Sequence, residues 1–399
     1  MALAPATARL LNLGHALDHL FLLIFATAVT TIAPEFGFAR WEDLLPYSAG
    51  AFLLFGLGSV PAGRLGDLWG RRNMMVIFFF GIGAAALLCA SAQNAWQMAA
   101  ALTLLGAFAA IYHPVGIPML LQQARNPGAT IGFNGLVGNL GIAVAAVLTG
   151  FMVKYVGWRM AFVAPALLSL ACGALFLRLT PRESESPARR TNKSTVTLPP
   201  ALLARLFAIM TCAAVASSLL FNFTTNGNGQ LLRERLAGLV DDPAQLGLLL
   251  AAVYTVASLA QLVVGRLIDR FALKPLYLAV VALQIPALLL AANAQGWWLF
   301  GLQIGFMVAI FGAIPFTDAM IVRYVDDAMR SRVTGMRLAV SFGISSLAVY
   351  LLGPLVKAAG FSSLLQAMAL IACCTAGCVL LLPADSSKTG KTIIGKTGD

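Results

Sequence analysis

Charged side chains are scarce in this sequence, and the motifs of several enzyme classes are missing. Asp, Glu, Lys and Arg make up 11% of the 399 residues, whereas soluble domains contain about 25%. The sequence contains no Gly-rich phosphate loop ending in Lys and Ser or Thr, no His-Glu-x-x-His and no Gly-x-Ser-x-Gly. We therefore expect neither a soluble domain nor an enzyme, and no ATP or other cofactor.

Cysteine is also rare, and its positions are uninformative about chemistry. The six residues all fall in apolar segments, at Cys89, Cys172, Cys212, Cys373, Cys374 and Cys378. None lies in an outer loop where oxidising conditions would pair it. We expect no structural disulfide and no metal site.

Long apolar runs, by contrast, are abundant. A membrane helix needs roughly 20 apolar residues to cross a hydrocarbon core of about 30 Å, and the sequence has twelve such stretches. No stretch alternates polar and apolar residues over the length of a barrel strand, so helices are predicted. The predicted spans are 10–33, 44–62, 74–91, 96–122, 131–153, 160–179, 202–223, 245–264, 275–292, 297–322, 333–356 and 364–382.

The loops between these spans predict the orientation. If the N-terminus is cytoplasmic, 21 of the 27 Lys and Arg residues lie on the cytoplasmic side, as the positive-inside rule requires. The net charge of +11 is thus explained by topology, and nucleic acid is not expected as a partner. The first span has no small-residue cleavage site after it, so it should stay in place. We predict a bacterial inner-membrane protein with both termini inside.

The chain divides into two halves that repeat a motif. Residues 180–200 form the longest polar stretch, a predicted cytoplasmic linker between bundles of six helices at 1–179 and 201–385, and 386–399 form a tail expected to be disordered. Gly-Arg-Leu-x-Asp occurs after the second span and again after the eighth, ending at Asp67 and Asp269. A repeat at matching positions predicts duplicated bundles related by an axis along the membrane normal.

The first copy of the motif carries a family resemblance. Gly63-x-x-x-Asp67-x-x-Gly70-Arg71-Arg72 resembles the signature loop of the major facilitator superfamily. The resemblance implies two six-helix bundles that alternate their access, with this loop as the inner gate. Leu68 departs from the usual basic residue. The second copy keeps Asp269 and Arg270 but lacks the later Gly, so the resemblance supports gating by Asp67 better than by Asp269.

Ionisable residues inside the spans are few and are functional candidates by default. His15, Asp18 and His19 share one face of the first span because of their i, i+3, i+4 spacing. Asp18 lies about 12 Å and His113 of the fourth span about 14 Å from the cytoplasmic end. All three histidines of the protein thus lie at one level beside a carboxylate. The cluster predicts a proton-coupling site, an anion-binding site or a polar knot that only locks the helices.

A narrower resemblance rests on the same spans. His-Ala-Leu-Asp-His, Tyr-His-Pro-Val-Gly and Gly-Leu-Val-Gly-Asn-Leu-Gly resemble the motifs of the fosmidomycin-resistance-type branch. The match implies functional roles for His15, His113 and Asn139. His19 stands where the branch has Asp, and Val115 replaces a Glu of the branch. The glycines around Asn139 are explained equally by helix packing and by bundle sliding.

The second half offers weaker candidates. Asn222 and Asn226 lie in a Gly- and Asn-rich end of the seventh span, which predicts either a flexible outer gate or a frayed helix end. Asp318, three residues after Pro315, is a candidate coupling residue, and pairing with a nearby Arg such as Arg323 explains it as well.

Together these patterns predict an all-α, twelve-helix secondary transporter. Proton-driven efflux of a small anionic or amphiphilic compound is our first interpretation, and proton-coupled uptake is the second. An integral-membrane receptor or enzyme would need an outer domain or catalytic groups, which are not visible. The expected partners are a small-molecule substrate, protons and lipid, and the expected state is a monomer.

Overall fold

The computed structural model describes residues 5–122, 127–182, 200–324 and 327–382, which are helical throughout apart from short turns. The first nine α-helices and two irregular turns are α1 (Pro5–Glu35), α2 (Trp41–Leu44), η1 (Leu45–Ser48), α3 (Ala49–Leu57), α4 (Ser59–Trp69), α5 (Arg71–Ser91), α6 (Ala95–Ala109), η2 (Tyr112–Gly116), α7 (Ile117–Leu121), α8 (Pro127–Tyr155) and α9 (Trp158–Leu179). The others are α10 (Pro200–Arg235), α11 (Pro243–Arg270), α12 (Leu273–Asn293), α13 (Gly296–Tyr324) and α14 (Asp327–Leu380).

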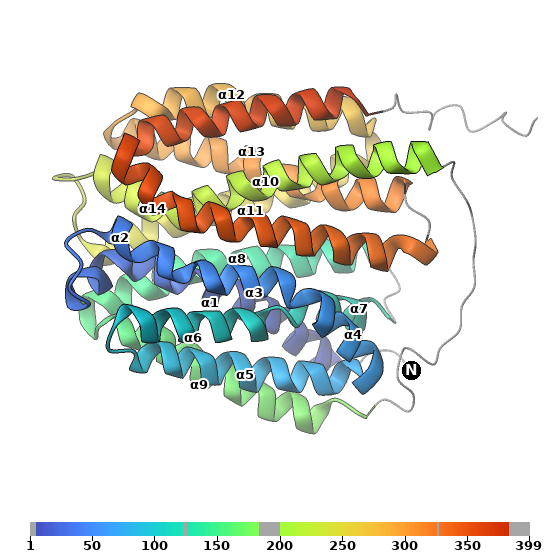
Figure 1. Ribbon diagram of the computed structural model, residues 1–399, viewed down its shortest axis with the longest axis horizontal. Coiled ribbons are helices and arrows are strands. Elements are labelled where there is room, and N and C mark those ends of the chain that lie inside the picture. Colours follow the sequence, from blue (N-terminus) through green and yellow to red (C-terminus); the bar gives the residue numbers. More distant parts are fainter. Residues whose placement is uncertain (1–4, 123–126, 183–199, 325–326, 383–399) are drawn as a thin grey trace, which may run out of the picture.

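These helices lie roughly along one direction in two neighbouring sets (Figure 1). Helices α1 to α9 occupy the lower half of the view and α10 to α14 the upper half. The sets pack together mainly through α8 against α11, α3 against α14 and α1 against α10. We call the end of the molecule where α1 begins the N-terminal end, at the right of Figure 1, and the other the opposite end.

Ten helices of the described residues are long and apolar enough to cross a membrane, or eleven if the segment Trp41–Leu57 and α4, bent by 43°, form one span. The predicted spans 333–356 and 364–382 both lie in α14. Gly360 separates them with φ of 75°, a left-handed conformation that favours glycine. The chain turns back at this residue, and Figure 1 shows the two arms of α14 running in opposite directions.

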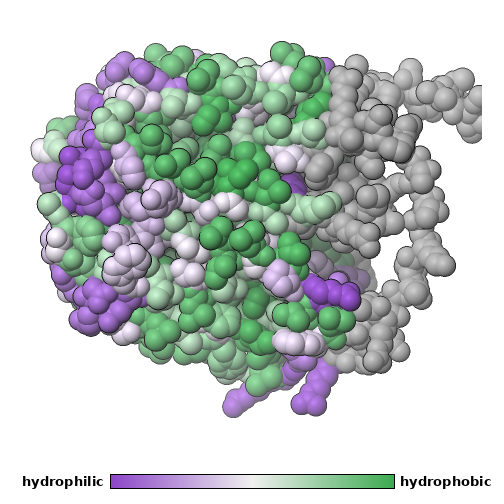
Figure 2. All heavy atoms as spheres, viewed as in Figure 1, coloured by the Kyte–Doolittle hydropathy of each residue, from purple (hydrophilic) through white to green (hydrophobic). Residues whose placement is uncertain are grey.

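The lateral surface is apolar. Figure 2 shows hydrophobic side chains over the middle of the molecule and hydrophilic ones gathered at the opposite end. Large exposed side chains include Leu290 (63%) and Leu370 (66%), which water would not favour. A surface of this kind, on helices of this length, is typical of a protein that crosses a membrane several times.

Three predictions on chain organisation have different outcomes. The Gly- and Asn-rich end of the seventh predicted span is not frayed, because α10 stays helical through Arg235 and buries both Asn222 and Asn226. Packing against neighbouring helices outweighs the low helix propensity of Asn and Gly there. Residues 183–199 of the predicted linker and the predicted tail 386–399 lie outside the described residues.

Candidate functional site

One face of α1 carries three polar side chains in the middle of an apolar helix. His15, Asp18 and His19 project from the same side, as their spacing predicts. His15 and Asp18 are buried, and His19 is half-buried. Since this face points into the protein, its polar groups are available to one another and to other helices instead of lipid.

The segment opposite α1 is irregular where prolines occur. After α6 ends at Ala109, the chain makes the π-helical turn η2 before α7 begins. Pro114 and Pro118 lack amide protons, so a regular hydrogen-bond ladder cannot pass through them. His113 lies in this turn, and its Nδ1 is 3.5 Å from Oδ2 of Asp18. Turns of this type are frequent at functional sites.

All three histidines of the chain meet at this place. The ring centroids are 4.7 Å apart for His15 and His19, 5.0 Å for His15 and His113, and 5.6 Å for His19 and His113. Nε2 of His15, Nδ1 of His113 and both carboxylate oxygens of Asp18 are buried without a hydrogen-bond partner. Buried polar atoms are nearly always paired in native proteins, so this cluster is the strongest candidate for binding a proton, an ion or a polar ligand.

A set of hydrogen bonds holds the His15 ring. Its Nδ1 is 2.8 Å from the backbone oxygen of Asn134 on α8. The side-chain amide of Asn134 donates to Oδ1 of Asn12 (2.9 Å) and to Oη of Tyr112 (2.8 Å). The Tyr112 ring stacks on His15 with centroids 4.7 Å apart. The position of His15 is therefore fixed from α1, η2 and α8 at once.

The sequence analysis did not assign roles to Asn12, Tyr112 or Asn134. The signal for Asn12 was present, because it precedes His15 by three residues and so shares its helix face. The predicted Asn139 is also buried on α8, but among the described residues it makes no hydrogen bond to this cluster. Asn134 is the asparagine of α8 that does.

Two glycines of α8 let this helix approach the cluster. A Cβ atom at Gly138 would come within 2.5 Å of the His15 ring, and one at Gly141 would collide with the backbone carbonyl of Ala16. The glycines thus have a packing function against α1 in this conformation.

A cation from the second helix set faces the cluster. Arg337 lies near the start of α14, and its guanidinium donates a hydrogen bond to Oγ1 of Thr317 (2.7 Å). Its positive charge interacts electrostatically with His113. Phe342 of the same helix contacts His113 with ring centroids 5.9 Å apart. No sequence pattern predicted a role for Arg337, because the approach of α14 to η2 has no local signal. The side chain of the predicted Asp318 lies outside the described residues.

The predicted asparagines of α10 are part of a separate network. The Asn222 amide donates to Oγ of Ser345 (2.8 Å) and to the backbone oxygen of Ser218 (2.9 Å). The Asn226 amide donates to the backbone oxygen of Asn222 (3.0 Å), and its Oδ1 is buried without a partner. The contact with Ser345 joins α10 to α14 and the other two lie within α10. Among the described residues none of them involves a histidine.

The predicted gate loop packs against η2. A Cβ atom at Gly63 would lie 3.2 Å from Pro114, and Gly70, with φ of 91°, makes the turn between α4 and α5. Asp67 lies in the last turn of α4, and it makes no hydrogen bond or ion pair among the described residues. The cap position of α5 is occupied by Gly70.

The two arginines of this loop bind backbone carbonyls. Arg71 donates to the Pro118 oxygen (3.3 Å), and the buried Arg72 donates to those of Leu177 (2.6 Å) and Thr180 (2.7 Å) at the end of α9. In the second copy of the motif, Arg270 is exposed in the last turn of α11. The Asp269 side chain lies outside the described residues.

At the opposite end, polar contacts join the two helix sets. Lys154 of α8 pairs with Asp242, and Lys357 of α14 pairs with Asp43 at 2.5 Å. The Lys154 ammonium lowers the pKa of Asp242, chiefly through their hydrogen bond. The Gln230 amide of α10 donates to the Ala26 oxygen of α1 (2.5 Å).

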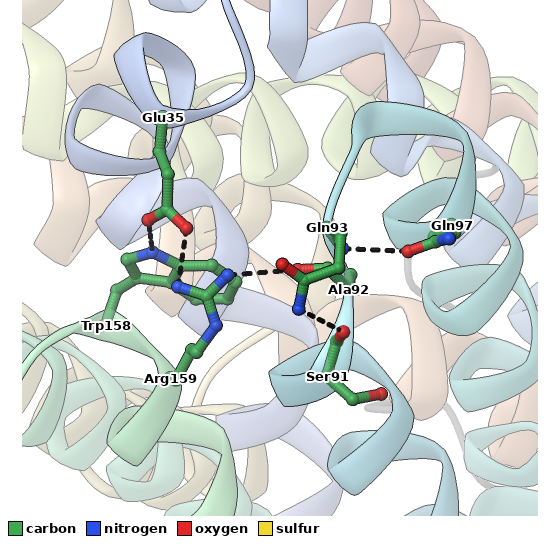
Figure 3. Close-up of polar contacts among 7 residues, drawn as sticks. All are labelled: Glu35, Ser91, Ala92, Gln93, Gln97, Trp158 and Arg159. Atoms are coloured by element: carbon green, nitrogen blue, oxygen red, sulfur yellow. Dashed lines mark hydrogen bonds and ion pairs between the residues drawn. The ribbon is translucent and has the colours of Figure 1, made fainter.

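A second polar group at the opposite end lies within the first helix set (Figure 3). Glu35, the last residue of α1, accepts a hydrogen bond from Nε1 of Trp158 (2.6 Å) and pairs with Arg159 (2.6 Å). Arg159 also donates to the Ala92 oxygen between α5 and α6 (3.1 Å). These contacts bind the ends of α1, α5 and α9 to one another.

Comparison with known proteins identifies the family. The model of the Major Facilitator Superfamily matches residues 11–236 and 234–397. The chain is 31% identical over 150 residues to the probable actinorhodin transporter of Streptomyces coelicolor, which covers 36% of this chain and 25% of that protein. It is 24% identical over 291 residues to the multidrug resistance protein MdtG of Escherichia fergusonii, covering 71% of this chain and 70% of that protein.

A further relative and a solved structure agree with this. The puromycin resistance protein pur8 of Streptomyces alboniger is 31% identical over 172 residues, 42% of this chain and 33% of that protein. The matches to the two Streptomyces proteins thus span only a quarter to a third of their length. The crystal structure of a bacterial homolog of the human lysosomal transporter Spinster shares the fold, with a TM-score of 0.73 at 14% identity over 94% of this chain and 95% of that one.

Proposed function

The chain belongs to the Major Facilitator Superfamily, and from this premise we propose that it is a secondary active transporter that exports a small anionic or amphiphilic organic compound in exchange for protons. The superfamily resemblance in the sequence is thereby confirmed, whereas its fosmidomycin-resistance branch stays part of the proposal. The observation that carries the coupling is the contact between the buried Asp18 and the half-buried His113, two titratable groups in otherwise apolar helices.

We assign the proton to this pair, because a buried carboxylate beside an imidazole can hold a proton in one conformation and release it in another. His15 and His19 complete the polar face at the same level. Arg337 supplies a fixed positive charge from the second helix set, which favours a substrate with an anionic group. Asn139, Asn222, Asn226 and Asp318 remain substrate-contact candidates of lower rank.

The proposed cycle alternates access between the two ends. We propose twelve crossings, with Gly360 dividing α14 into two, and both termini in the cytoplasm of a bacterial cell. The contacts of Lys154 with Asp242 and Lys357 with Asp43 then close the outer side. Gly63, Asp67, Gly70, Arg71 and Arg72, with Asp269 and Arg270 of the second copy, form the proposed inner gate. We propose that the protein acts as a monomer in the inner membrane.

The direction of transport is proposed from relatives. The names of the aligned proteins refer to transport of actinorhodin and to puromycin and multidrug resistance, which favours export of bulky organic compounds. The proposal therefore names a class of substrate.

The test uses cells and then proteoliposomes. Accumulation of a panel of anionic and amphiphilic fluorescent dyes is compared in cells with and without the protein. A dye whose accumulation differs between the two is then used to measure flux in proteoliposomes with an imposed pH gradient. We expect lower accumulation in cells with the protein and gradient-driven flux that Asp18→Asn and His113→Gln abolish. Thr375→Val of α14, where the hydroxyl donates to the Ile371 oxygen of the same helix, is the control and should retain flux.

Two results would contradict the proposal. Flux that persists unchanged in both Asp18→Asn and His113→Gln would remove the coupling pair. Higher accumulation in cells that make the protein would replace export by proton-coupled uptake, the second interpretation of the sequence.

A further inference from the structure

The three histidines offer more ligand atoms than a proton site requires. One ring nitrogen of each of His15, His19 and His113 lies within 4.8 Å of the other two. No hydrogen bond joins the three rings within the described part of the chain. Nitrogen lone pairs that converge without a donor between them are an arrangement that a metal cation satisfies.

We propose that His15, His19 and His113 bind a divalent transition-metal ion of the zinc class at the level of η2. The proposal stands on the geometry of the cluster, and it holds whether or not the chain couples transport to protons. Imidazole nitrogens are preferred ligands of zinc, copper, nickel and iron, whereas calcium and magnesium prefer oxygen.

The spacing of the rings fits one ion. When three imidazoles bind zinc tetrahedrally with Zn–N distances of about 2.0 Å, the ligand atoms lie about 3.3 Å apart and the ring centroids about 5 Å apart. The observed centroid distances of 4.7, 5.0 and 5.6 Å bracket this value. To reach the bonded spacing, ligand atoms up to 4.8 Å apart would approach one another by up to about 1.5 Å through side-chain rotation.

One of the three rings has the outer partner that a metal ligand needs, and a second has a carboxylate nearby. A metal-bound histidine almost always donates its other ring N–H to a carbonyl or a carboxylate, which fixes the ring and its tautomer. Nδ1 of His15 lies 2.8 Å from the Asn134 carbonyl, and its Nε2 is buried without a partner. In His15, Nε2 is then the atom left for the metal. Nδ1 of His113 lies 3.5 Å from Oδ2 of Asp18 without a hydrogen bond between them, so a closer approach of Asp18 would give His113 the same support.

Two charged side chains near the histidines affect how strongly a cation binds there. Asp18 is completely buried next to His113, and a bound cation would favour its ionised form, whose negative charge offsets part of the charge of the ion. Arg337 acts on His113 from α14 with the opposite sign. With three protein ligands, a fourth coordination position is open for water or an anionic ligand, as in zinc sites that exchange ligands.

The test measures binding of zinc and cobalt to the full chain in detergent micelles, without substrate or gradient. The protein is purified on a tag that contains no histidine, and Cys212, Cys373, Cys374 and Cys378 are changed to Ser to remove competing thiols. We expect one zinc ion per chain by equilibrium dialysis, a zinc-dependent rise in Tm, and the visible absorption bands of tetrahedral cobalt.

Variants of the cluster locate the ion. His15→Gln, His19→Gln and His113→Gln should each abolish the cobalt bands, and Asp18→Asn, which changes an outer partner, should weaken zinc binding by about 10- to 100-fold. Arg337→Gln should tighten it, because a repelling charge is removed. Asn139→Ala is the matched control and should bind zinc like the parent protein.

Several outcomes would overturn the inference. They are the absence of stoichiometric zinc binding in the parent protein, binding that survives His19→Gln in a protein that remains monodisperse, and binding that disappears with the cysteine changes alone. Since none of these measurements uses transport, a failed metal site and a failed proton-coupling site give different results. His19, which is only half-buried, keeps the test valid if the His15 variant does not fold.

Discussion

Asp67 and Arg72 come from one short loop, yet their surroundings differ completely. Arg72 is buried and binds two backbone carbonyls at the end of α9, which a charged donor satisfies well. Asp67 is half-buried at the end of α4 and has no partner among the described residues. In the described conformation, Arg72 has a structural role, and the proposed gating role of Asp67 must be fulfilled in another conformation.

We predict that Asp67→Asn leaves the stability of the purified protein unchanged and slows transport. Within the described ranges the carboxylate has no hydrogen bond or ion pair that its loss would break, whereas a partner formed only during the cycle would be lost. Thermal unfolding in detergent micelles measures the first effect, and dye flux in proteoliposomes measures the second.

Arg72→Met provides the opposite pattern. Each hydrogen bond from a charged group contributes about 1.5–3 kcal/mol, so its loss should lower the Tm clearly. The exposed Arg64 is a matched control, and Arg64→Met should leave the Tm near the parent value.

The result that would contradict the prediction for Asp67 is a wild-type transport rate for Asp67→Asn at normal expression, which would count against its role in the gate.

At the scale of elements, α8 packs against helices of both sets. It contacts α1 of its own set through Gly138 and Gly141, and α11 of the other set through Gly150, where a Cβ atom would lie 2.5 Å from the Pro243 oxygen. Small residues allow such close approach of backbones in membrane proteins. The position of α8 therefore sets both the geometry of the histidine cluster and the contact between the helix sets.

We predict that Gly141→Ala destabilises the protein by about 1–3 kcal/mol, the usual cost of overpacking. Its Cβ would meet the Ala16 carbonyl, which is backbone and cannot rotate away. Gly132 of the same helix has no atom within 4 Å of the added carbon. Gly132→Ala should therefore be neutral or stabilising by up to about 1 kcal/mol, because alanine favours helix.

Thermal unfolding of both variants provides the measurement. A Gly141→Ala protein as stable as Gly132→Ala would show that α1 and α8 are free to move apart, and would support the bundle-sliding role that the sequence left open.

On the scale of the whole molecule, ion pairs join the two helix sets at the opposite end. Lys154 pairs with Asp242 and Lys357 with Asp43. The pKa of Asp242 is held below its ordinary value by Lys154. Because a lowered carboxyl pKa means that the charged pair is favoured, the pair persists at neutral pH and is lost only as the pH falls through that lowered pKa.

We predict that the double variant Lys154→Gln, Lys357→Gln separates the sets at the opposite end. Spin labels on cysteines that replace the exposed Trp96 of α6 and Trp298 of α13 report the distance between the sets, in a background without the native cysteines. The variant should show a longer distance component than the parent protein, because two contacts that favour the closed arrangement are missing.

Arg159→Gln is the control for this measurement. It breaks an ion pair with Glu35 that lies inside one helix set (Figure 3), so the distance between the sets should not change. An identical distance distribution in the double variant and the parent would show that the remaining contacts, among them the glycine contacts and the hydrogen bond from Gln230 to Ala26, keep this end closed.

The sequence alone determined the class of protein and the location of its polar chemistry. The scarcity of charge and the length of the apolar runs require membrane helices, because unpaired backbone groups are too costly in lipid. The spacing of His15, Asp18 and His19 places them on one helix face without any knowledge of the fold. The Gly-x-x-x-Asp motif indicated the superfamily, which the family match confirms.

Only the tertiary structure decided which groups meet. The approach of η2 and α8 to α1 brings Asn134 and Tyr112 to His15, and the approach of α14 brings Arg337 to His113. Helix packing also brings three histidines together as a candidate metal site. The positions of the cysteines had predicted no metal site. Such contacts depend on how helices far apart in the chain pack, and side-chain periodicity describes one helix at a time.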